Sequence, residues 1–245
     1  MSSLPTIRPR RSVLYMPASN ARAIEKARAL PCDAVILDLE DAVAPDAKNA
    51  ARAQAAAAIR EGGFGRREVI LRVNGQATPW GEADLAAAAE AGPDAVLVPK
   101  VNDAAELQAY DRALAGAPER TRLWAMIETG KAILNLKEIG EAARRTRLAA
   151  LCVGGQDLGK EMRARHTPDR APLHAALALT VTAARAYGLV ALDSVYTEIG
   201  NAHGLAAECR QGLEFGFDGK TLIHPSQIEA ANAAFSPTPE EIAWA

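Results

Sequence analysis

Charged side chains follow several of the short apolar runs in this chain, and their positions suggest a common site. The acids are Asp38, Glu40, Asp41, Glu128 and Asp157, and the cations are Arg72 and Lys100. Removing several charges from water is costly unless they pair with one another or hold an ion. Such a cluster therefore favours a functional site over a chance arrangement.

Glu128 and Asp157 are the candidate ligands of a divalent cation. Mg²⁺ is commonly held by one or two carboxylates, with water and substrate oxygens completing an octahedron. The absence of His or Cys beside them in the sequence argues against zinc. Spacing alone leaves an alternative open, in which each carboxylate caps the following helix or pairs with Arg72 or Lys100.

The two cations have different expected roles. Arg72 follows an apolar run, and its planar fork suits a bidentate bond to a substrate carboxylate or enolate oxygen. An ion pair with Glu40 or Glu128 is the alternative for this guanidinium. Lys100 could form a Schiff base if desolvation lowered its pKa, but so many neighbouring acids favour a protonated, electrostatic role.

The remaining acids, Asp38, Glu40 and Asp41, lie within four positions of one another. Each could cap a helix or form a salt bridge. Three acids so close together also suggest an arrangement around a cation or its water ligands. His224 precedes Pro225 and is either a polar residue at the site or the cap of a turn.

The elements that must position these residues follow from the alternation of short apolar runs with alanine-rich segments of helical period. Strands are predicted over 12–16, 34–39, 68–73, 95–99, 122–127, 148–153, 191–195 and 220–223. Helices are predicted over 20–30, 47–60, 83–91, 104–115, 132–144, 173–187, 202–215 and 225–234.

Eight such strand–helix units in 245 residues predict an α/β fold, a (β/α)₈ TIM barrel forming one domain over 1–245. We expect the barrel to occupy about 11–235 and a short tail to occupy 236–245. A doubly wound open sheet is the alternative, but it needs a glycine-rich turn after the first strand, and residues 17–20 contain no glycine. Active sites of such barrels lie at the carboxyl ends of the strands, where the charged residues fall.

Composition excludes several classes of protein. The formal net charge is −2 and aromatic residues make up 4% of the chain, which argues against nucleic-acid binding. No apolar run approaches the length needed to span a membrane. Three cysteines without metal-type spacing indicate reduced thiols, so we expect a cytoplasmic protein.

Seven segments carry a resemblance that runs in order along nearly the whole chain. They are RSVLYMP at 11–17, VILDLEDAV at 35–43, RVN at 72–74, VPK at 98–100, IET at 127–129, GFDGK at 216–220 and IHPSQI at 223–228. In these segments the chain resembles the citrate lyase β-subunit (CitE-like) branch of the HpcH/HpaI aldolase family. The LDLEDAV and GFDGK…IHPSQI segments are the specific ones.

The resemblance implies a Mg²⁺-dependent carbon–carbon lyase. Its substrates would be 3-hydroxyacyl thioesters of the citryl-CoA, malyl-CoA or citramalyl-CoA type, carried on CoA or on an acyl carrier protein and cleaved to an acyl thioester and a 2-oxo acid. By motif, Glu128 and Asp157 would hold Mg²⁺, and Arg72 and Glu128 would contact substrate. Arg72, Glu40 and Asp41 would be the catalytic group, with the two acids orienting water on the metal. A homo-oligomer, trimer or larger, is also implied.

Departures from the family leave other functions open. The sixth predicted strand is followed by Gly154-Gly155-Gln156-Asp157, which keeps the aspartate but changes its neighbours. We expect most of the family's C-terminal helical segment, which packs over a neighbouring subunit's site, to be missing. The alternatives are a class II aldolase that acts on free 2-oxo acids and a catalytically inactive, metal-binding partner subunit.

Overall fold

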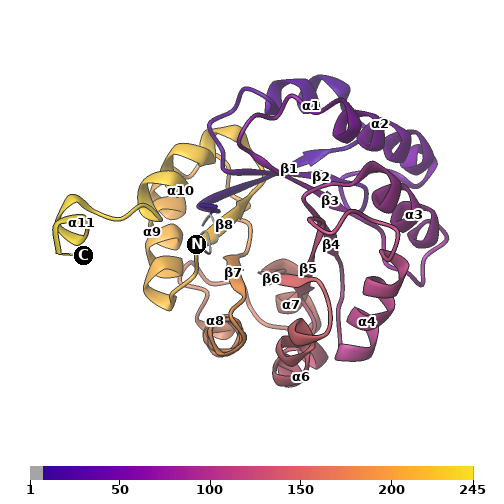
Figure 1. The fold of residues 1–245 in the computed structure, drawn as a ribbon. Helices are drawn as coiled ribbons and strands as arrows, with labels where there is room; N and C mark the ends of the chain where they lie inside the picture. Colours follow the sequence, from indigo (N-terminus) through magenta and orange to yellow (C-terminus); the bar gives the residue numbers. More distant parts are fainter. Residues whose placement is uncertain (1–7, 245) are drawn as a thin grey trace, which may run out of the picture.

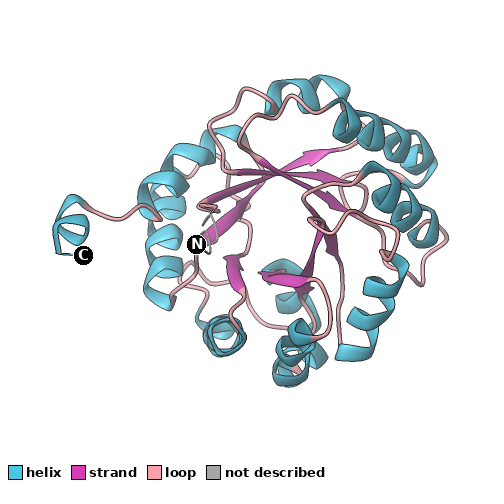
Figure 2. Ribbon diagram, in the orientation of Figure 1, coloured by secondary structure: helices cyan, strands magenta, loops and turns pink. Residues whose placement is uncertain are grey.

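The computed structural model describes residues 8–244, and its centre is a closed barrel of parallel strands (Figures 1 and 2). Each strand pairs with the next along the chain, and β1 pairs with β8 to close the ring, with Val13 beside Thr221. The strands are β1 (Ser12–Pro17), β2 (Ala34–Asp38), β3 (Glu68–Arg72), β4 (Ala95–Val98), β5 (Arg122–Ile127), β6 (Leu148–Val153), β7 (Val190–Asp193) and β8 (Gly219–Leu222).

Helices surround this barrel (Figure 2). They are α1 (Ala21–Ala27), α2 (Lys48–Glu61), α3 (Gly81–Ala91), α4 (Ala104–Ala113), α5 (Gly130–Leu134), α6 (Leu136–Glu141), α7 (Gly155–Glu161), α8 (His174–Tyr187), α9 (Ala202–Phe215), α10 (Ile228–Ala234) and α11 (Pro239–Trp244). Side chains of Asn20, Asp103, Thr129 and Asn201 cap four of them by accepting backbone N–H bonds. The last helix, α11, projects away from the barrel wall (Figure 1).

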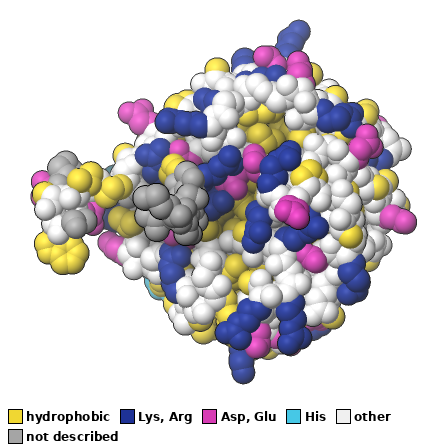
Figure 3. All heavy atoms as spheres, in the orientation of Figure 1, with side chains coloured by type: hydrophobic (Ala, Val, Ile, Leu, Met, Phe, Trp, Pro, Cys, Tyr) yellow, Lys and Arg dark blue, Asp and Glu magenta, His cyan; other side chains and the backbone are white. Residues whose placement is uncertain are grey.

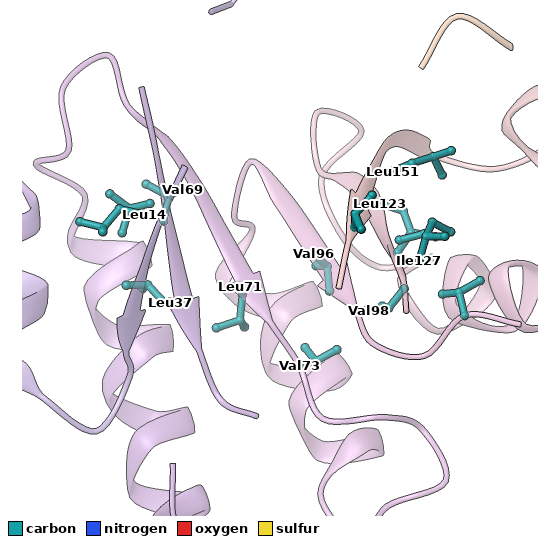
Figure 4. Packing of buried hydrophobic residues seen from close by; sticks show 14 of the residues in the cluster. Leu14, Leu37, Val69, Leu71, Val73, Val96, Val98, Leu123, Ile127 and Leu151 are labelled. Atoms are coloured by element: carbon teal, nitrogen blue, oxygen red, sulfur yellow. The ribbon is translucent and has the colours of Figure 1, made fainter. Parts of the chain in front are cut away.

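Alternation along the strands divides the core into two groups. One group packs between the strands and the helices and includes Leu37, Leu71 and Ile127 (Figure 4). The other fills the barrel interior and includes Ile36, Ile70, Leu97, Trp124 and Met126. Both faces of the strands are therefore buried, and the packed interior forms the floor of the mouth where the strands end.

The predicted TIM barrel is confirmed, and each strand begins and ends within two residues of its predicted position. One predicted helix needs correction, and two further helices were not predicted. The helix predicted over 132–144 is broken at Asn135, whose side chain donates to the carbonyl of Asn102 at 2.9 Å. Helix α7 was not predicted because its two glycines hide the helical period, and α11 was not predicted either.

The surface carries charges of both signs. Figure 3 shows Lys and Arg side chains interspersed with Asp and Glu over the face that it presents. Within residues 8–244, every helix is too short or too polar to cross a membrane.

Candidate active site

Arg72 and Asp38 form the central ion pair at the mouth of the barrel. They are neighbours in the register of β2 and β3, and both side chains are buried. Arg72 donates from Nε to Oδ1 of Asp38 at 2.7 Å and from Nη2 to Oδ2 at 2.6 Å. Asp38 also accepts the backbone N–H groups of Glu40 and Ala42 at 2.8 and 3.2 Å, so the turn after β2 fixes the carboxylate that holds the guanidinium.

The third nitrogen of Arg72 faces the two acids that follow. Nη1 lies 3.0 Å from Oε2 of Glu40 and 3.2 Å from Oδ2 of Asp41. Although burial opposes the charge, the hydrogen bonds and charge of Asp38 raise the pKa of Arg72, so it stays protonated. The predicted ion pair with Glu40 is present. The structure adds Asp38 and Asp41 as partners, and Glu128 forms no ion pair with this guanidinium among residues 8–244.

Glu40 lies in an enclosed position beside both cations. Burial raises the pKa of Glu40 to about 7, because it outweighs the opposite effect of the nearby Arg72. Among residues 8–244 its buried Oε2 has no hydrogen-bond partner, and its Oε1 lies 3.7 Å from Nζ of Lys100. The carboxyl group of Glu40 therefore changes charge near neutral pH.

Glu128 directly follows β5 and is held by the backbone of the loop that follows the neighbouring strand β4. Lys100 has φ of +49°, and its N–H donates to Oε1 of Glu128 at 2.7 Å. Burial raises the pKa of Glu128. A Cβ at Gly154 would lie 2.4 Å from Oε2 of Glu128 and 3.0 Å from Cε of Met126. Glycine at this position therefore leaves the room that the carboxylate occupies.

Asp157 lies in the first turn of α7 and is 41% exposed. Its Oδ2 is 3.6 Å from Nζ of Lys100. Although burial opposes the charge, Glu40, Glu128 and Asp157 raise the pKa of Lys100. The ammonium group therefore stays protonated between carboxylates, as the sequence suggested, and is a poor candidate for a Schiff base.

A cavity of about 350 Å³ opens at this mouth and brings most of the predicted residues together. Its lining includes Asp41, Arg72, Glu128 and Asp157, together with Asp38 and Tyr15. Glu40 and Lys100 do not line the cavity but contact residues that do. The lining residues can reach a ligand directly, whereas Glu40 contacts Arg72 and Lys100 instead.

The donor set fits a hard divalent cation that keeps several water or substrate ligands. Glu128 and Asp157 offer carboxylate oxygens on the same cavity. Among residues 8–244 no three His, Cys, Asp or Glu side chains lie close enough to form a metal cluster. Two carboxylates suffice for Mg²⁺, which retains waters, but not for a zinc centre built from His and Cys.

Three residues behind the site were not identified from the sequence. Nζ of Lys48, on α2, donates to the carbonyls of Leu39 and Glu40 and to Oδ1 of Asn74, all within 2.8 Å. Asn74 donates in turn to Asp84 at 2.6 Å. This network fixes the loop that carries Glu40 and Asp41. Only the asparagine in the RVN segment gave any sequence signal, because Lys48 and Asp84 lie in ordinary helical patterns.

Residues at the end of the barrel sequence are structural. His224 is exposed, and its ring accepts the N–H of Ser226, which makes it the cap of a turn. Lys220 is fully buried on β8 and donates to Asp193 at 3.2 Å and to Glu208 at 2.6 Å. This second ionic cluster joins β7, β8 and α9 beside the cavity.

Comparisons with known proteins agree with this geometry. The family model of HpcH/HpaI aldolase/citrate lyase matches residues 11–225. A (3S)-malyl-CoA thioesterase of Cereibacter sphaeroides strain KD131 is 51% identical over 96% of this chain and 80% of its own length. Citrate lyase subunit beta of Escherichia coli K12 is 34% identical over 96% of this chain and 80% of its own.

A crystallised relative has the same fold. The citrate lyase beta subunit of M. tuberculosis, complexed with oxaloacetate and magnesium, superposes with a TM-score of 0.79 at 31% identity, covering 94% of this chain and 98% of the other. The family match, the sequence identities and the fold confirm the resemblance found in the sequence. The chain therefore belongs to the HpcH/HpaI aldolase/citrate lyase family, in the branch of the citrate lyase β-subunits.

Proposed function

We propose that this protein is a Mg²⁺-dependent carbon–carbon lyase that cleaves or condenses a 3-hydroxyacyl-CoA thioester of the malyl-CoA, citramalyl-CoA or citryl-CoA type. The products of cleavage are an acyl-CoA and a 2-oxo acid. One observation carries the proposal: Glu128 and Asp157, the metal ligands that we assign, share a single cavity with the buried guanidinium of Arg72. The names of the relatives, and the magnesium and oxaloacetate of the crystallised one, support it.

The metal ligands are Glu128 and Asp157. When bound there, Mg²⁺ supplies Lewis-acid polarisation of the oxygen that becomes the 2-oxo group. Glu128 is held in place by the N–H of Lys100, and Gly154 leaves its second oxygen unobstructed. The ammonium of Lys100 offsets part of the negative charge of these carboxylates before any ligand arrives.

Formation of the enolate moves one proton and one electron pair. The hydroxyl proton of the substrate passes to a base, the bond between the hydroxyl-bearing carbon and the thioester α-carbon breaks, and its electrons form the thioester enolate. The α-carbon of the enolate then takes up the proton that the base removed, or one from water, which gives the acyl-CoA. Arg72 stabilises the enolate charge from the cavity wall. Asp41 lines the same cavity, where it would orient a water molecule beside a bound Mg²⁺.

Glu40 is assigned a positioning role. It does not line the cavity, but it lies beside Arg72 and Lys100, and its pKa is about 7. Its ionisation near neutral pH therefore adjusts the charge opposite both cations without contact to substrate.

The test is a product assay. The protein is incubated with malyl-CoA, citramalyl-CoA and citryl-CoA, with Mg²⁺ or with EDTA, and acyl-CoA and 2-oxo acid are quantified. We expect cleavage of at least one thioester that EDTA abolishes and added Mg²⁺ restores. Metal-independent cleavage would contradict the proposal. Exchange of pyruvate α-protons without any thioester would favour the free 2-oxo acid aldolase, and binding of Mg²⁺ and acyl-CoA without turnover would favour an inactive partner subunit.

Thioester hydrolysis is a second candidate, because a relative with 51% identity is a malyl-CoA thioesterase. In that reaction water adds to the thioester carbonyl, the carbon–sulfur bond breaks, and malate and free CoA thiol are released. The same assay separates the two reactions. Lyase activity yields glyoxylate and acetyl-CoA from malyl-CoA, whereas hydrolysis yields malate and a thiol that reacts with a disulfide reagent.

We also infer a homo-oligomer, trimer or larger, in the cytoplasm. The projecting helix α11 exposes 64% of Ile242 and 91% of Trp244, an apolar surface suited to contact with another subunit (Figure 1). Three free, buried cysteines suit a reducing compartment. Light scattering after size-exclusion chromatography tests the assembly, and a monomeric mass would contradict it.

A further inference from the structure

Tyr15 lines the cavity but has no role in the reaction proposed above. It lies two positions after Val13 on β1, and both side chains face the barrel interior. Its ring packs against the guanidinium of Arg72, with Cζ 4.8 Å from the ring centroid. Tyr15 also lines the cavity that contains Glu128 and Asp157. The phenol is therefore placed among the groups that would surround the substrate.

Arg72 has few donors left for a substrate. Two of its five N–H groups bond to Asp38, and Nη1 faces Glu40 and Asp41. Nη1 donates one hydrogen bond, to Asp41, so one N–H of Nη1, which faces Glu40, and one N–H of Nη2 lack a hydrogen-bond partner among residues 8–244. Three carboxylates therefore surround the charge of this guanidinium, so a substrate oxygen that becomes negative gains less from Arg72 than from an unpaired arginine.

The hydroxyl of Tyr15, in contrast, has no strong partner. In the described part of the chain its hydrogen bond goes to the sulfur of Met126, at 3.6 Å, and a thioether is a weak acceptor. Burial raises the pKa of Tyr15 well above its usual value, with Arg72 acting in the opposite direction. The phenol therefore keeps its proton and offers an O–H group that a better acceptor can take from the sulfur.

Resting on the proposed function, we propose that Tyr15 donates a hydrogen bond from Oη to the thioester enolate oxygen and shares its stabilisation with Arg72. The hydroxyl of Tyr15 points to the side chain of Met126, and Met126 lies near Glu128. Cε of Met126 and Oε2 of Glu128 both lie within 3.0 Å of the position that a Cβ on Gly154 would occupy. The hydroxyl thus lies on the side of the cavity that holds a metal ligand. A neutral donor there stabilises developing negative charge without attracting a further carboxylate.

The test is the Tyr15→Phe variant, which removes one oxygen atom and keeps the ring on Arg72. Removing one preorganised oxyanion donor lowers kcat by about 100-fold or more in enzymes where it dominates, and we expect a loss of about 10- to 100-fold because Arg72 remains. KM should change by less than about threefold. Exchange of the acetyl-CoA methyl protons with deuterated water, measured with Mg²⁺ and oxalate present, should slow in parallel because it reports enolate formation.

Tyr187→Phe is the matched control. Its ring packs against Gly140 on α6, outside the cavity, and its hydroxyl makes no hydrogen bond within residues 8–244. We expect wild-type kinetics from it. An unchanged kcat in Tyr15→Phe overturns the inference. So does a loss of kcat that is accompanied by a similar fold-loss of Mg²⁺ affinity or by a lowered thermal midpoint. Absence of turnover in the wild type would instead overturn the proposed function, and the inference with it.

Discussion

Replacing Gly154 with alanine should weaken both Mg²⁺ binding and the fold, because the added methyl group would displace Glu128. The new Cβ would lie 2.4 Å from Oε2 and 2.5 Å from Cβ of Glu128, whereas ordinary contacts begin at 3.4 Å. Glu128 would therefore have to move by about 1 Å, on a side chain that is almost fully buried. Mg²⁺ requires near-ideal octahedral geometry at about 2.0–2.1 Å, so a displacement of that size misplaces a ligand.

The magnitudes follow from this displacement. Overpacking of a buried site costs typically about 1–3 kcal/mol of unfolding free energy. Disturbing the surroundings of a metal ligand costs about 10- to 100-fold in metal affinity, and we expect at least that loss here. The assays are calorimetric titration with Mg²⁺ and urea denaturation in EDTA. The backbone of Gly154, with φ of −98°, is open to alanine, so the effect is steric.

Gly159→Ala is the matched control, because Gly159 lies in the same helix α7 and an added Cβ there meets no atom within 4 Å. It should keep wild-type Mg²⁺ affinity and gain up to about 0.5–1 kcal/mol of stability, since alanine is the better helix former. Unchanged Mg²⁺ affinity in Gly154→Ala, with stability lowered, would show that Glu128 is not a metal ligand. Unchanged affinity and stability together would refute the packing argument itself.

Three further variants probe charge at the site and in the core. With EDTA present, the free energy of unfolding of Glu40→Gln should rise by up to about 3 kcal/mol relative to wild type between pH 4.5 and 7.5. The reason is that only wild type must ionise a carboxyl group whose folded pKa is about 7. Urea denaturation at both pH values measures this, and the same difference in stability between the two proteins at both would contradict it. Asp157→Asn should abolish Mg²⁺-dependent cleavage and leave the thermal midpoint unchanged, since its side chain is 41% exposed. Lys220→Met should cost about 3–5 kcal/mol in urea denaturation, because the buried carboxylates of Asp193 and Glu208 would share one remaining cation, Arg170, and Mg²⁺ affinity should not change.

The barrel could be predicted because its signals are local. Strands buried on both faces read as short apolar runs, and the alanine-rich helices between them keep their period within a few turns. Because every strand is parallel, the residue after each run falls at the same mouth, which places Arg72, Glu128 and Asp157 together without further information. Helix α7 could not be predicted because Gly155 and Gly159 interrupt the helical period of its sequence.

The partners of each charge could not be predicted, because they depend on register and loop geometry. The sequence allowed Arg72 to pair with Glu40 or Glu128, whereas the register of β2 and β3 sets it beside Asp38. The contact between Lys100 and Glu128 depends on a left-handed backbone that no residue type announces, since lysine rarely adopts it. The place of Tyr15 beside Arg72 depends in the same way on how β1 pairs with β2.

The balance of charge at the mouth explains why so many acids are needed around one arginine. Two cations, Arg72 and Lys100, face five carboxylates, and the two that we assign to the metal are the ones that do not pair with the guanidinium. Asp38, Glu40 and Asp41 hold Arg72 from three sides, whereas Asp157, within residues 8–244, pairs only with the ammonium group of the half-exposed Lys100. A bound divalent cation would therefore displace Lys100 from Asp157 without disturbing Arg72. The substrate oxygens would then contact the guanidinium of Arg72 and the neutral phenol of Tyr15 on one wall of the cavity and the metal on the other.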